Sequence, residues 1–214
     1  MAVCQGVKGT LEFQAGHWPE SDSALREAIK LNRQLGAVFG EALACASLGN
    51  LLTAQGRLDE SLVVLGEGLA AAERSKTRYH ALARLYGALA YNRLAAGEMS
   101  AAADALSFGS RLSEEHGRCA TCETVLASVA VSIRVAQGNL AVAETLCQQL
   151  DEAAARYGGH NWQALAGKAR AELAEAQGDR ETAVTLFQQA HDDFRIANNE
   201  FAAAQCEAAL AHYQ

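Results

Sequence analysis

The chain has 214 residues, a formal net charge of -7, and a composition that is 50% hydrophobic but only 6% aromatic. An acidic chain without a Lys/Arg cluster lacks the basic stripe that grips phosphate backbones, which argues against direct binding of nucleic acid. No apolar run approaches the roughly 20 residues that span a bilayer, and no secretory signal is apparent. These absences predict a protein of the cytoplasm that binds no membrane. The abundance of alanine and the single proline predict that it is helical.

Five glycines recur at spacings of 40, 41, 41 and 40 residues, each at the end of an Ala/Gln-rich stretch: Gly16, Gly56, Gly97, Gly138 and Gly178. Residues at fixed offsets from these glycines also repeat. The fifth residue after each glycine is small, and the ninth is larger and apolar: Leu25, Leu65, Leu106, Cys147 and Phe187. Acidic residues after the glycines favour a helix start there, because carboxylates stabilise helix N-termini. Each unit is therefore predicted to be a helix, a tight turn and a second helix.

In chain order the predicted units span about 1–36, 37–76, 77–117, 118–158 and 159–198, and residues 200–214 form a final helix. Weaker helix breakers such as Gly36 and Asn198 separate the units. Stacked helix pairs bury between neighbours a face that no single pair can bury alone. The repeat therefore predicts one domain over 1–214, an all-α, right-handed α-solenoid of five antiparallel helix pairs plus a C-terminal covering helix.

Small residues on both sides of the turn, with a bulky residue between, resemble the tetratricopeptide (TPR) repeat. Its best copy here combines Leu48, Gly49, Gly56, Leu58, Ser61, Leu65 and Gly68. The period of about 40 differs from the usual 34, and Tyr86 is the one aromatic residue at the position where the family has one near the start of the first helix. Units of this length are similar to those of bacterial transcriptional regulators of the maltose-activator type. HEAT-type repeats share the length and remain an alternative.

The TPR resemblance implies a non-catalytic scaffold that binds a protein or peptide in a concave groove lined by the first helices of the pairs. The groove candidates that it gives are Asn50, Arg84, Tyr91, Ser128, Ser132, Lys168 and Glu172. Arg84 and Asn50 suit a carboxylate or a peptide backbone, and Tyr91 suits a stacked contact. For each of them the alternative is a solvated polar side chain on a helix.

His116, Cys119 and Cys122 are the one group with metal-like spacing. A structural zinc site normally has four ligands, and neither a second CxxC nor a paired histidine is present, so we expect no metal. Cys45, Cys147 and Cys206 lie where the repeat needs small apolar residues, and reduced thiols are expected. No P-loop, GxGxxG, HExxH or GxSxG motif is present, so neither an enzyme nor a cofactor is predicted.

The resemblance thus favours the sensing or assembly region of a bacterial transcriptional regulator, excised from a longer protein. Two alternatives remain open at this stage. The stack could close around a small-molecule effector, or its end helices could form a homo-oligomer.

Overall fold

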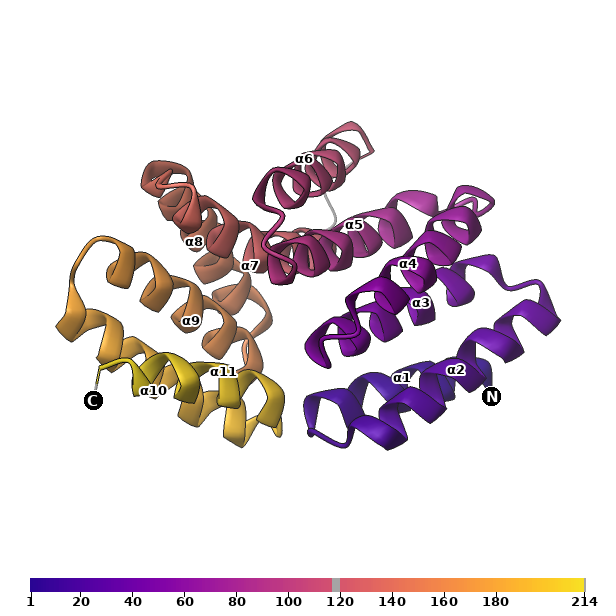
Figure 1. Ribbon diagram of the computed structural model, residues 1–214, viewed down its shortest axis with the longest axis horizontal. Coiled ribbons are helices and arrows are strands. Elements are labelled where there is room, and N and C mark those ends of the chain that lie inside the picture. Colours follow the sequence, from indigo (N-terminus) through magenta and orange to yellow (C-terminus); the bar gives the residue numbers. More distant parts are fainter. Residues whose placement is uncertain (117–119, 214) are drawn as a thin grey trace. The chain divides into compact units, whose positions relative to one another are not determined.

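The computed structural model describes residues 1–116 and 120–213. Within these ranges the regular structure consists of eleven helices, with no strand, which confirms the predicted all-α class (Figure 1). In chain order they are α1 (Ala2–Gln14), α2 (Trp18–Leu35), α3 (Val38–Ala54), α4 (Leu58–Glu73), α5 (Arg78–Ala95), α6 (Met99–Glu115), α7 (Ala120–Ala136), α8 (Leu140–Tyr157), α9 (His160–Ala176), α10 (Arg180–Ile196) and α11 (Glu200–Ala211).

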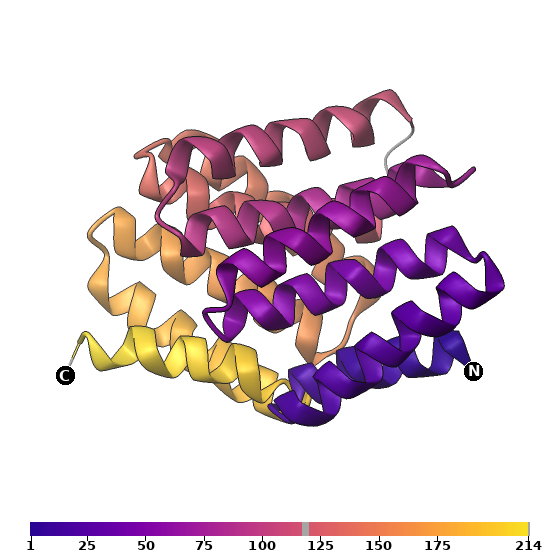
Figure 2. The same cartoon turned by 45° about the vertical axis from the view of Figure 1, so that its right-hand side comes forward.

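The helices fall into two compact units. Unit 1 comprises Met1–Phe13 and His17–Leu126, and unit 2 comprises Gln14–Gly16 and Ala127–Gln214. In unit 1, α3 packs against α4 and also lies beside α5, which in turn packs against α6 (Figure 2). In unit 2, α9 packs against α8 and α10, and α10 against α11. The single domain over 1–214 remains a prediction.

The five repeat glycines all occupy the left-handed region of backbone space, with φ between 70° and 82°. Gly56 illustrates the turn: beyond it, the Arg57 amide donates to the Leu52 carbonyl at 2.9 Å, closing the end of α3. A side chain at such a φ costs about 1 kcal/mol or more, which explains why glycine recurs. The next helix starts two residues after each glycine, so the predicted helix–turn–helix arrangement is confirmed at these positions.

The residue seven positions before each turn glycine is glycine or alanine except for Val131, and a small residue there permits close approach of the two helices. A Cβ atom at Gly49 would lie 2.4 Å from Cδ2 of the buried Leu65, so this position of α3 has no room for a side chain. The Ser61 hydroxyl donates to the Gly49 carbonyl at 2.9 Å. The pair α1–α2 repeats both contacts with Gly9, Leu25 and Ser21. The offsets found in the sequence are therefore packing contacts.

Apolar burial follows the repeat in both units. The core of unit 1 is built mainly from leucine and alanine of α2 to α5, with Leu25, Leu65 and Leu85 almost fully buried. In unit 2 the cluster of α9 to α11 is centred on Phe187 and Phe194. Among the described residues no helix combines the length and apolar character needed to cross a membrane.

Candidate functional site

Three of the predicted groove residues lie in unit 1, on two neighbouring helices. Asn50 is on α3, and Arg84 and Tyr91 are on α5; all three are half-buried. Seven residues separate Arg84 from Tyr91, which places both on the same side of α5 about 10 Å apart. Asn50 and Tyr91 occupy the same place in their repeats, six residues before Gly56 and Gly97, and α3 packs beside α5. We call Asn50, Arg84 and Tyr91 the first-helix face.

Arg84 is the charged residue of the first-helix face. Its helix, α5, contains no Asp or Glu, and the arginines near its ends are neutralised by neighbours, Arg78 by Glu73 and Arg93 by Glu98. Among the side chains that the structure describes, which leave out residues 117–121, 123–125 and 214, no carboxylate pairs with Arg84. A half-buried guanidinium that no described carboxylate neutralises can bind a carboxylate from outside through two parallel hydrogen bonds.

On the second helices of the pairs in unit 1, by contrast, arginines are paired with carboxylates. On α2, Arg26 contacts Asp22 at 2.8 Å and Glu60 at 2.7 Å, and Arg33 contacts Glu41 at 2.6 Å. A hydrogen bond from Arg26, which has the larger effect, and one from Arg57 lower the pKa of Glu60. These guanidinium groups are already bound to carboxylates within the chain, which leaves them less free than Arg84 to take a ligand.

The other four groove candidates lie in unit 2, and three of them bind one another. Ser132 on α7 donates to Oε2 of Glu172 at 2.7 Å, and the Lys168 ammonium donates to Oε1 of the same carboxylate at 2.6 Å. Ser128 is half-buried on α7. The lysine and glutamate charges therefore cancel within the cluster, so these four candidates offer a ligand less charge than Arg84 does.

The structure brings an unpredicted histidine to the metal-like motif. Nδ1 of His80 lies 3.7 Å from Sγ of the buried Cys122, and the His116 ring stacks on Tyr79 with centroids 4.3 Å apart. Cys119 lies outside the described residues. In the part of the chain that the structure describes, no group of three His, Cys, Asp or Glu side chains is placed to hold a metal ion.

No family model matches the chain, and no curated protein is significantly similar to it. The repeat and the geometry of the side chains therefore carry the functional conclusions.

One exposed aromatic cluster cannot be found from the features that the repeats share. Phe108 on α6 is 49% exposed, stacks on Tyr86 with centroids 5.3 Å apart, and lies under the Arg111 guanidinium at 4.6 Å. The sequence nevertheless contains a signal for it. Phe108 is the eleventh residue after its turn glycine, and in the other four repeats this position is polar: Glu27, Glu67, Gln149 and Gln189. Exposed aromatic and arginine side chains are common at protein contact sites.

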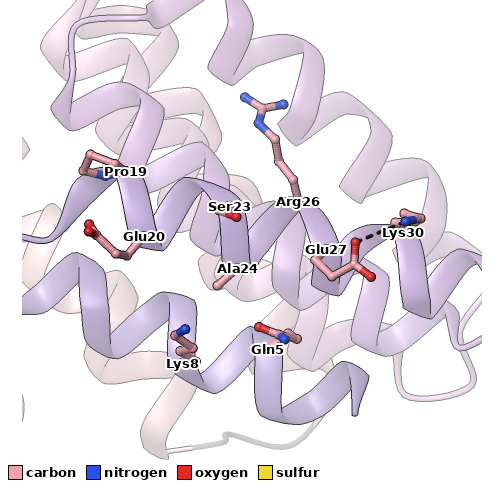
Figure 3. Close-up of a pocket in the computed structure, with 9 residues that line it drawn as sticks. All are labelled: Gln5, Lys8, Pro19, Glu20, Ser23, Ala24, Arg26, Glu27 and Lys30. Carbon is pink, nitrogen blue, oxygen red and sulfur yellow. Dashed lines mark hydrogen bonds and ion pairs between the residues drawn. The ribbon is translucent and has the colours of Figure 1, made fainter.

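A depression of about 720 Å³ lies between α1 and α2 (Figure 3). Its rim carries charges of both signs, and several are already paired, as Lys30 is with Glu27 at 3.3 Å. Lys8 on α1 and Glu20 on α2 are exposed and make no ion pair with another described residue. The lining residues are mostly charged or polar.

The buried cysteines lead to a prediction about thiol reactivity. Burial raises the pKa of Cys45 to about 12 and those of Cys147 and Cys206 to about 11, whereas Cys4 is exposed on α1. Because the thiolate is the reactive form, we expect a maleimide at neutral pH to modify Cys4 at least about 100-fold faster than these three. Mass spectrometry of tryptic peptides at timed intervals measures the rates. Comparable rates at all four sites in the folded protein would contradict the described packing.

Proposed function

We propose that the chain is a TPR-like, right-handed α-solenoid of five helix pairs with a covering helix, and that it binds a segment of another protein or a peptide. In this proposal it forms the sensing or assembly part of a bacterial transcriptional regulator and works in the cytoplasm, without catalysis or a cofactor. The observation that supports it most is the half-buried Arg84, which pairs with no described carboxylate, although the arginines of α2 are neutralised.

The first-helix face suits an extended peptide that carries a carboxylate. A guanidinium group binds a carboxylate through two parallel hydrogen bonds, which fixes both its position and its orientation. The Asn50 amide can donate to and accept from a peptide main chain, and Tyr91 offers an amphipathic surface beside Arg84. We therefore propose that the peptide is anchored at Arg84 by an Asp or Glu side chain or by its C-terminal carboxylate.

Substitution of Arg84 tests this anchor. Peptides selected from a random display library are resynthesised with each carboxylate converted to an amide, and their affinities are measured by fluorescence anisotropy. Losing a charge-assisted hydrogen bond costs about 1.5–3 kcal/mol, so Arg84→Ala is expected to weaken binding about 10- to 100-fold. Amidation of the anchoring carboxylate is expected to weaken wild-type binding equally and to have little further effect on Arg84→Ala.

The matched control is Arg195→Ala, which removes an exposed arginine from α10 and is expected to leave binding unchanged. Unchanged affinity in Arg84→Ala, or amidated peptides that bind as tightly as their parents, would refute the proposed anchor.

A further inference from the structure

Helix α1 presents an apolar stripe to solvent. Val3 is 73% exposed, Val7 is 54% exposed and Leu11 is 57% exposed. Residues spaced by four lie on one side of a helix, so these three side chains form a continuous surface, the α1 stripe. A row of exposed large apolar residues on one helix typically marks a contact surface.

The equivalent residues in the other helix pairs show how this side of the first helix packs elsewhere in the chain. The residues equivalent to Leu11 are all at most 2% exposed: Leu51, Asn92, Ile133 and Leu173. The residues equivalent to Cys4, which is exposed on the same side of α1, are at most 5% exposed: Ala44, Leu85, Leu126 and Ala166. In the inner helix pairs this side of the first helix is therefore buried at the Leu11 and Cys4 positions and half-buried at the Val3 position, which is held by Leu43, Arg84 and Leu165. In α1 all of these positions are exposed.

Hydrogen bonds within unit 1 identify what covers these positions. Nδ2 of Asn92 on α5 donates to Thr53 Oγ1 at 3.3 Å and to the Leu58 carbonyl at 3.1 Å, both in the preceding helix pair. Ser47 is the equivalent of Val7, and its Oγ lies 3.2 Å from Oγ1 of Thr10 on α1. Val7 and Leu11 of the α1 stripe therefore occupy positions that contact the preceding helix pair in later repeats.

We propose that the α1 stripe is the contact surface of a homodimer, in which α1 of one copy packs against α1 of a second copy. Such a twofold contact requires a self-complementary surface. Antiparallel pairing about an axis at Val7 sets Val3 of each copy against Leu11 of the other. This self-association goes beyond the proposed peptide binding.

Charge also favours a second copy at this surface. Two chains of net charge -7 repel each other, but α1 carries one lysine and one glutamate and is neutral through its side chains. Lys8 and Glu20, at the adjoining rim in Figure 3, make no ion pair with another described residue, so two copies can neutralise both charges. A single short helix buries less than the roughly 800 Å² per partner of a standard interface, so we expect dissociation constants in the micromolar range or weaker.

Sedimentation velocity of the whole chain, from about 5 µM to about 1 mM, tests the proposal because this range brackets the expected affinity. The wild-type chain is expected to shift from monomer to dimer. The double variant Val7→Asp with Leu11→Asp is expected to weaken association more than about 10-fold, since two carboxylates would be desolvated. Val7→Ser, which installs the residue found at Ser47, is a milder variant that is expected to weaken association less.

The matched control is Val63→Asp, which places the same charge on a 62% exposed valine of α4 and is expected to leave the dimer intact. A monomeric wild-type chain at all concentrations, or equal loss of the dimer in the control, would overturn the proposal. Peptide binding separates the two proposals, because the α1 variants are expected to retain it and Arg84→Ala is expected to retain the dimer.

Discussion

Replacing Phe187 by alanine is expected to lower the free energy of unfolding by about 3–5 kcal/mol. Phe187 is 2% exposed and lies in the unit 2 cluster with Ala171, Ala190 and Phe194. Its ring occupies the ninth position after the turn glycine, where the other units have leucine or cysteine. Truncation removes the apolar contacts and leaves a cavity between α9 and α10 that the rigid helix pair cannot close.

Urea-induced unfolding followed by circular dichroism measures this loss, and hydrogen exchange of the amides locates it in unit 2. The control is Phe108→Ala, which removes the same side chain from a 49% exposed site on α6 and is expected to cost less than about 1 kcal/mol. Equal losses from the two variants would mean that Phe187 is not buried as described.

The second large effect is expected from Gly49→Ala. The added Cβ would lie 2.4 Å from Cδ2 and 2.7 Å from Cγ of Leu65, a side chain that is 1% exposed and has no free space to enter. Overpacking of this kind typically costs about 1–3 kcal/mol, even though alanine is the better helix former. We therefore expect a lower urea midpoint and weaker packing of α3 on α4.

The same substitution at Gly66 is expected to have the opposite sign. Gly66 is an exposed residue of α4, and a Cβ added there meets no neighbouring atom within 4 Å, so Gly66→Ala gains helix propensity without a clash. A gain of about 0.5–1 kcal/mol is expected from the smaller entropy of the unfolded chain. Stabilisation by both substitutions, measured by the same urea titration, would contradict the close approach at Gly49.

The helix boundaries were predictable because turn chemistry is local. A glycine such as Gly56, at positive φ between two helical stretches, sets both helix ends without help from tertiary structure. The small and bulky offsets were predictable for a related reason: Gly49 and Leu65 meet within one unit, so their spacing is fixed by the turn between them. Local periodicity therefore carried most of the fold.

The candidate site depended on contacts that periodicity does not determine. From their positions in first helices, Arg84 and Lys168 were both predicted to be groove residues. In the structure Lys168 pairs with Glu172, whereas Arg84 pairs with no described carboxylate. The approach of His80 to Cys122 joins residues 42 positions apart, and the shared offsets of the repeat do not specify it. Phe108 was not predicted because periodicity reveals what the units share, whereas Phe108 is a departure from the shared pattern.

Photo-crosslinking from the first-helix face tests the central claim most directly. A benzophenone amino acid replaces Tyr91 on α5 in one variant and Val63 on α4 in the other, and both are mixed with the selected library peptides. Peptide binding at this face predicts crosslinks from position 91, next to an acidic residue or the C-terminus of the peptide, that disappear when Arg84→Ala is added. Crosslinks that form mainly from position 63, or that persist without Arg84, would contradict it.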